Sequence, residues 1–161
     1  MGAGPKSLLL GDVSSGQVLP ELGYDVSATT VILGALATRD WRPMHHDKDF
    51  AINRNGVKNI FMNTPNLAAW FERYVTDWTG PKGRPGRMKF RMRDSIFPDD
   101  RMVFTGTVEN VGTDEAGCGW AEVTVAVKVG ERLCTSCEVR VALPVDTDDN
   151  PWTRRGDRWK P

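Results

Sequence analysis

The chain has 161 residues, with 21 Lys and Arg against 21 Asp and Glu, 2 His and 3 Cys. That length suits one domain, and a hydrophobic fraction of 40% with six Trp and six Phe excludes global disorder. The balanced charge argues against a nucleic-acid partner, and no apolar run reaches the roughly 18 residues of a membrane helix. An odd number of Cys favours a reducing compartment over a disulfide framework, so we expect a cytoplasmic protein.

The first third of the chain is the least regular. Residues 1–15 are rich in Gly and Ser and predict a flexible N-terminus. Residues 17–25 predict a short strand or extended arm, and the β-branched, apolar run 27–36 predicts a strand. The polar segment 39–59 predicts a long loop with one helical turn near 47–52. Loops of that length are usually functional.

A helix is predicted over residues 65–78, because its apolar side chains recur at helical spacing. They are Leu67, Phe71, Tyr74, Val75 and Trp78. Thr64 can cap the start, where Pro65 is favourable because its missing N–H has no intrahelical partner. Gly80 and Pro81 end the pattern.

The second half of the chain predicts four strands of alternating polarity. They span residues 86–96, 101–111, 120–129 and 133–143. The connections between them are short, so we expect consecutive strands to be antiparallel neighbours. One long helix packed on such a sheet is an α+β architecture, and we place this domain at residues 16–143.

Residues 144–161 form a charged tail with three Pro and two isolated Trp, Trp152 and Trp159. The composition favours disorder. The alternative is that both Trp side chains dock on a partner or on the surface of the domain itself.

Both histidines, His45 and His46, lie in the polar segment, five and six residues after Asp40. Pro43 between them allows a turn that brings Asp40 to His45. A neutral imidazole beside a carboxylate is an acid–base pair suited to catalysis near pH 7. The residues alone leave open both this pair and a solvated loop without chemistry.

The run Asp40-x-x-Pro43-x-His45, followed after five residues by Ala51, resembles the signature of the MaoC-like (R)-specific enoyl-CoA hydratases, D-x-N-P-φ-H-x5-A/S. The stretches ATRDWRPMHHDKDFA and NIFMN…RYVTDWTGP are similar to one branch, the small hydratase subunit of bacterial cholesterol side-chain degradation. The resemblance covers about residues 15–143. Arg42 stands where the family has Asn.

This resemblance implies a hot-dog fold, in which an antiparallel sheet wraps one central helix. It also implies hydration of a trans-2-enoyl-CoA, here with a bulky, steroid-like acyl group, to a 3-hydroxyacyl-CoA without any cofactor. His45 would take the water proton, and Asp40 would orient the water and deliver the Cα proton. A backbone N–H of Asn63 or Thr64, where the family often has His-Gly and this chain has Met62-Asn63, would hold the thioester oxygen.

The family also implies a second hot-dog subunit, so we expect a homodimer or a heteromer. Lys82, Arg84 and Arg87 could contact the CoA phosphates, although such basic residues are more often only solvated. A hot-dog acyl-CoA thioesterase and a non-catalytic acyl-CoA-binding subunit are the alternative functions.

A metal site is not expected. Cys134 and Cys137 have metal-ligand spacing, but a strand places residues three apart on opposite faces. We therefore expect Cys137 to be buried and Cys134 to be half-exposed.

Overall fold

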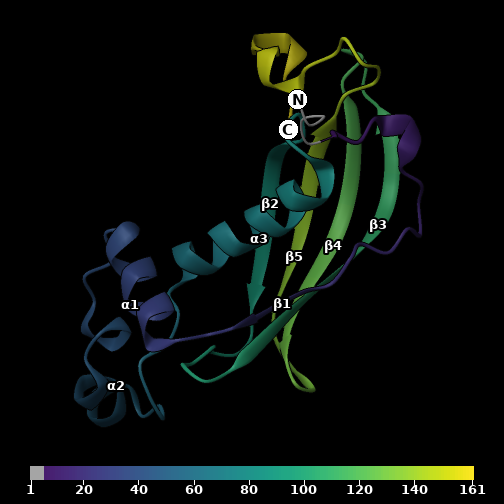
Figure 1. Ribbon diagram of the computed structural model, residues 1–161. Coiled ribbons are helices and arrows are strands. Elements are labelled where there is room, and N and C mark those ends of the chain that lie inside the picture. Colours follow the sequence, from purple (N-terminus) through teal and green to yellow (C-terminus); the bar gives the residue numbers. More distant parts are fainter. Residues whose placement is uncertain (1–5) are drawn as a thin grey trace, which may run out of the picture.

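A five-stranded antiparallel sheet curves around one long helix in the computed structural model, which describes residues 6–161 (Figure 1). The helices are α1 (Ala28–Ala37), α2 (Lys48–Asn55) and α3 (Thr64–Thr79). The strands are β1 (Leu22–Asp25), β2 (Arg84–Met92), β3 (Arg101–Thr113), β4 (Gly119–Val129) and β5 (Arg132–Leu143). This is the hot-dog arrangement that the family resemblance implies.

The central helix α3 forms where the apolar spacing predicts it. Asn63, rather than Thr64, is its N-cap: the side chain of Asn63 accepts a hydrogen bond from the backbone N–H of Asn66. Gly80 ends the helix with a φ of 76°, a conformation that a residue with a side chain rarely adopts.

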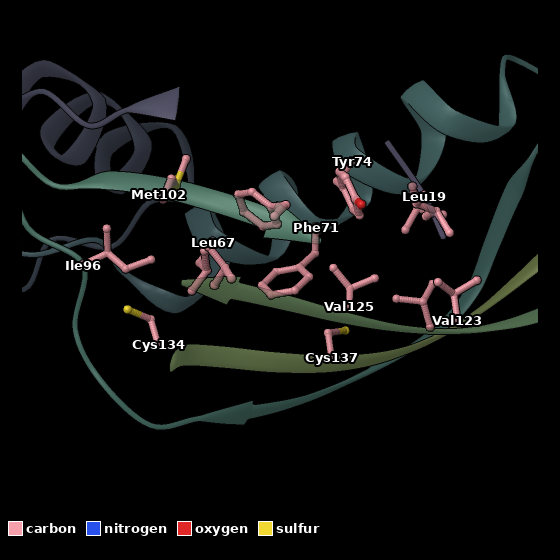
Figure 2. Packing of buried hydrophobic residues seen from close by; sticks show 14 of the residues in the cluster. Leu19, Leu67, Phe71, Tyr74, Ile96, Met102, Val123, Val125, Cys134 and Cys137 are labelled. Atoms are coloured by element: carbon pink, nitrogen blue, oxygen red, sulfur yellow. The ribbon is translucent and has the colours of Figure 1, made fainter. Parts of the chain in front are cut away.

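The core lies between α3 and the concave face of the sheet (Figure 2). Phe71 is fully buried and packs edge-to-face on Phe104 of β3, with ring centroids 5.1 Å apart, and on Phe90 of β2 at 5.3 Å. The alternating valines of β4 are buried as predicted, among them Val123, Val125 and Val127. Burying these side chains on both layers is the main source of stability of the fold.

The strand order β1-β3-β4-β5-β2 corrects one prediction, because β2 pairs with β5 and not with β3. The strand ends at Met92, so the connection to β3 runs over residues 93–100. A segment of that length reaches about 26 Å, whereas three inter-strand spacings amount to about 14 Å. The connection can therefore cross the end of the sheet and place β2 on its far edge.

Residues 27–36, predicted as a strand, form α1 instead. The Ser27 side chain caps its start by accepting a hydrogen bond from Thr30 N–H. Val31 and Ala35, one helical turn apart, are the buried residues of α1. Its neighbour is α3, from which Asn66 donates a hydrogen bond to the Thr30 carbonyl. Capping and this tertiary packing outweigh the β propensity of the run.

The predicted long loop over 39–59 contains more structure than one turn. A 3-10 turn, η2 (Pro43–His45), precedes α2, which is capped by Asp47 and extends beyond the predicted turn at 47–52. Gly56 ends α2 in the left-handed conformation, with a φ of 68°. Figure 1 shows α1 and α2 beyond the amino end of α3.

Cys134 is buried, which corrects the expectation that it would be half-exposed. The pairing of β4 with β5 shifts register between Val127 and Lys128, so β5 carries an irregularity at this point. The strict alternation of sides is broken there, and both Cys134 and Cys137 lie among the core side chains (Figure 2).

The two ends of the described chain pack near the carboxyl end of α3 (Figure 1). Part of the predicted flexible N-terminus, residues 1–5, lies outside the described residues. Leu8 N–H donates to the Thr79 carbonyl and Leu10 N–H to the Pro144 carbonyl.

The C-terminal tail corrects the preference for disorder, because it docks on the domain. It contains two 3-10 turns, η3 (Pro151–Thr153) and η4 (Gly156–Arg158). Trp159 packs on Trp120 with ring centroids 5.0 Å apart. The structure therefore shows docking on the domain for Trp159, whereas Trp152 remains 46% exposed.

Candidate active site

Asp40 follows the end of α1 and points into the structure, with its side chain 9% exposed. Its position depends on a sharp change of direction: Arg39 has a φ of 54°, and Asp40 N–H donates to the Ala35 carbonyl. The hydroxyl of Thr38 binds the Gly34 carbonyl and closes the last turn of α1. The carboxylate is thus fixed by the backbone that ends α1.

Four hydrogen bonds converge on the Asp40 carboxylate. Arg42 donates from Nε to Oδ1 and from Nη2 to Oδ2, both at 2.8 Å, and its backbone N–H donates to Oδ1 at 3.4 Å. Asn63 donates from Nδ2 to Oδ2 at 3.0 Å. The Arg42 hydrogen bonds are the main cause that holds the pKa of Asp40 well below its usual range, so this group is ionised.

His45 is buried, at 3% exposure, and has a defined tautomer. Its Nδ1 lies 2.7 Å from the carbonyl oxygen of Phe61. A carbonyl can only accept, so the hydrogen of the neutral ring is on Nδ1. In that neutral form Nε2 is an acceptor, and it has no hydrogen-bond partner among residues 6–161. It lies 3.5 Å from Oδ2 of Asp40.

His45 forms part of the wall of a pocket of about 280 Å³ at the amino end of α3. The residues that line it include Arg42, His45, Asn63 and Thr64. Asp40 binds Arg42 and Asn63 but does not itself line the pocket. The remaining lining residues are Met44, Phe61, Met62, Leu67, Met92, Arg93, Asp94 and Ser95.

The start of α3 gives this pocket a site for negative charge. The first N–H groups of a helix have no intrahelical acceptor, and the helix dipole adds partial positive charge there. Asn63 and Thr64, the residues predicted to hold a thioester oxygen, occupy this start and line the pocket. The chain therefore brings together a base, an ionised carboxylate and a helix N-terminus.

The side chain of Asn63 has a role that sequence reasoning missed. Its Oδ1 caps α3, while its Nδ2 donates to Asp40 and to the hydroxyl of Thr38 at 2.9 Å. One amide thus joins the carboxylate to the helix start. Asn is a frequent N-cap, but nothing in its spacing from Asp40 indicates the second contact.

The three residues predicted to contact CoA do not lie at this pocket. Lys82 donates from Nζ to the carbonyl oxygens of Thr147 and Asp149. Arg84 donates to the carbonyl oxygens of Pro151 and Arg154 and stacks on Trp159, 3.6 Å from the ring centroid. Both cations therefore bind the C-terminal tail.

Arg87 is exposed on β2. His46 follows η2 directly after His45 and is exposed. Within residues 6–161, no group of three or more His, Cys, Asp or Glu side chains is placed to hold a metal ion. None of the helices in the same part of the chain is long and apolar enough to cross a membrane.

Comparisons with known proteins agree with this arrangement. The chain is 38% identical over 96 residues to the 3-oxo-4,17-pregnadiene-20-carboxyl-CoA hydratase beta subunit of Mycobacterium tuberculosis, which is 60% of this chain and 74% of the relative. No family model matches the chain.

Among solved structures, a chain of the ChsH1–ChsH2 complex from Mycobacterium tuberculosis is similar with a TM-score of 0.75 and 32% identity, over 81% of this chain and 98% of that one. The (R)-hydratase from A. caviae involved in PHA biosynthesis has a TM-score of 0.73 at 21% identity, over 82% and 98%, and shows the same fold. With the Asp40–His45 signature placed beside the start of α3, the chain belongs to the MaoC-like (R)-specific enoyl-CoA hydratase family.

Proposed function

We propose that the protein adds water across the double bond of a trans-2-enoyl-CoA and so forms a 3-hydroxyacyl-CoA. The observation that carries the proposal is His45: its Nε2 has no hydrogen-bond partner among residues 6–161, and the residue is part of the wall of the pocket at the start of α3. Hydration needs these two parts: a base for the water and a donor for the thioester oxygen. Similarity to a hydratase beta subunit supports the same reaction.

The proposed steps balance within the site. The O–H bond of water breaks as its proton moves to Nε2 of His45, and the water oxygen bonds to Cβ. The electron pair of the double bond moves toward the thioester oxygen, whose negative charge is held by a backbone N–H of Asn63 or Thr64. Cα then takes one proton from the Asp40–His45 pair, which returns the pair to its starting state, and the carbonyl re-forms. No electrons leave the substrate, so we propose that the reaction needs no cofactor.

A bulky acyl group is proposed because the similar beta subunit is described as acting on a pregnadiene carboxyl-CoA. The pocket of this chain alone, about 280 Å³, is at the lower limit of the usual size of ligand sites. A steroid would therefore need a larger pocket than one chain supplies. We propose that a second hot-dog subunit completes it, which the similarity to a two-component complex supports.

Exposed apolar side chains at this end of the molecule also support a partner. Leu33 and Leu36 on α1, Trp41 beside Asp40, and Ile52 on α2 are between 40% and 65% exposed. All four belong to α1, α2 or the segment between them, so we propose that a partner covers this end of the molecule. In the absence of the second hot-dog subunit, a second copy of this chain would cover these side chains in a homodimer.

The test is product analysis with crotonyl-CoA, a medium-chain enoyl-CoA and a steroid enoyl-CoA, with and without a co-expressed second hot-dog subunit. We expect 3-hydroxyacyl-CoA, with the highest kcat/KM for the steroid substrate in the heteromer. Release of free CoA would instead indicate a thioesterase, and bound but unchanged substrate a non-catalytic subunit. If crotonyl-CoA were the best substrate in both settings, the bulky acyl group would be wrong.

A further inference from the structure

Arg42 takes the position of the family Asn, and its contacts set the state of Asp40. A carboxylate has about four lone-pair sites for hydrogen bonds. In this structure Oδ1 accepts from Nε and the backbone N–H of Arg42, and Oδ2 accepts from Nη2 of Arg42 and Nδ2 of Asn63. The acceptor capacity of Asp40 is therefore filled by protein donors.

The same two residues separate Asp40 from the pocket. Arg42 and Asn63 line the pocket, and Asp40 is not among the described residues that do. The Arg42 side chain is 63% exposed while that of Asp40 is 9% exposed, so the guanidinium lies on the solvent side of the carboxylate. A substrate in the pocket would meet the guanidinium and His45 rather than Asp40.

We propose that Arg42 is a positioning residue that keeps Asp40 an ionised, shielded partner of His45, so that His45 alone carries the proton in the hydration. The inference rests on the proposed function and refines it. The water proton moves to Nε2, the imidazolium is stabilised by the carboxylate 3.5 Å away, and Nε2 then returns that proton to Cα. Asp40 is assigned no proton transfer, in contrast to the role that the family resemblance implies.

The charged groups around Asp40 are consistent with this assignment. Arg42 and His45 are the charged or titratable side chains that contact it, and the Asn63 amide from α3 is neutral. The hydrogen bonds from Arg42 are the largest cause of the lowered pKa of Asp40, ahead of the opposing effect of burial. Loss of Arg42 would therefore raise the pKa of Asp40 and leave Oδ1 without its side-chain donor, while Oδ2 keeps the hydrogen bond from Asn63.

The first test measures Asp40 directly, without any assay of activity. The carboxyl carbon of Asp40 is followed by NMR between pH 2.5 and 7 in the wild-type chain and in the Arg42→Gln, Arg42→Lys and Arg39→Gln variants. We expect no titration in the wild type, a midpoint within this range in Arg42→Gln, and a smaller change in Arg42→Lys. Arg39 is an exposed cation next to Asp40 in sequence, so Arg39→Gln controls for the loss of one positive charge.

The second test is kinetic and uses the same variants in the active complex. Arg42→Gln should lower kcat about tenfold with KM changed less than about twofold, and Arg42→Lys should restore part of kcat. An Asp40 carboxyl that titrates alike in wild type and Arg42→Gln would overturn the proposal, as would a wild-type kcat in Arg42→Gln. If no variant or wild-type complex hydrates an enoyl-CoA, the proposed function fails, and the NMR titration still decides whether Arg42 controls Asp40.

Discussion

One arginine lies near each end of α3, Arg42 before η2 and Arg84 at the start of β2, and the two arginines are used differently. At the amino end, Arg42 is largely exposed, lines a pocket and holds a buried carboxylate. At the carboxyl end, Arg84 stacks on Trp159 and donates to the backbone of the tail. The first arginine lines the same pocket as His45, whose Nε2 has no hydrogen-bond partner among residues 6–161. The second arginine binds the carbonyl oxygens and a ring of the tail.

This difference shows what separates a site from a packed surface. At the amino end, polar groups line a pocket, and Nε2 of His45 has no hydrogen-bond partner among residues 6–161. At the carboxyl end, Nη1 of Arg84 donates to two carbonyl oxygens and its guanidinium stacks on Trp159, which also packs on Trp120. We expect changes at the amino end to affect the reaction, and changes at the carboxyl end to affect stability.

The largest expected effect is at the amino end. His45→Gln should lower kcat about 10³–10⁴-fold, because the proton acceptor is lost, and Asp40→Asn about 10²-fold, because only its support of the imidazolium is lost. Steady-state kinetics with the proposed enoyl-CoA substrates measure both. His46→Gln is the matched control and should retain activity, and circular dichroism checks that all three proteins fold. An essential His46 would show that the site has been assigned to the wrong histidine.

An intermediate effect is expected at the carboxyl end. Trp159→Ala should lower the free energy of unfolding by about 1–3 kcal/mol, since it removes the contact with Trp120 and the cation–π contact with Arg84. Trp152→Ala should cost less, because Trp152 is 46% exposed and its ring centroid lies 5.5 Å from the Arg84 guanidinium. Chemical denaturation measures both values. A kcat in Trp159→Ala as low as in His45→Gln would mean that the two ends are coupled.

The smallest effect is a pH dependence of stability at the amino end. The pKa of Asp40 is lowered in the folded protein, chiefly by Arg42. Its contribution to stability is therefore present above the ordinary carboxyl pKa of about 4 and is lost as the pH falls toward the folded value.

Denaturation of wild type and Asp40→Asn between pH 7 and pH 2.5 checks this dependence. The difference in unfolding free energy should decrease by about 1 kcal/mol as the pH falls below about 4. Asp25→Asn is the control, because Asp25 is 79% exposed in a surface ion pair, and such pairs contribute little. A difference that does not vary with pH would contradict the ionic pairing of Asp40.

The sequence determined the central layers of this protein, because they depend on local periodicity. Apolar residues at helical spacing from Leu67 to Val75 sufficed for α3, and alternation sufficed for the buried faces of β3 and β4. In β5 it failed at Cys134, where the pairing with β4 shifts register. The contact of Asp40 with His45 was one of two alternatives that the residues left open, and the family resemblance favoured it; a short turn through Pro43 brings the two side chains to 3.5 Å. Local pattern is enough where the partners are neighbours in sequence.

Tertiary structure decided the features that depend on distant partners. The segment of α1 has β-branched residues, and only its packing on α3 and its cap at Ser27 make it a helix. The edge position of β2 follows from how the sheet closes around α3. Likewise, the Phe61 carbonyl sets the tautomer of His45, and Trp159 stacks on Arg84. The partners in both contacts are too far apart in sequence for a helical or strand period to relate them. Contacts between residues far apart in sequence leave no periodic pattern. The structure was therefore needed to show that Arg42 binds Asp40 and that Arg84 binds the C-terminal tail.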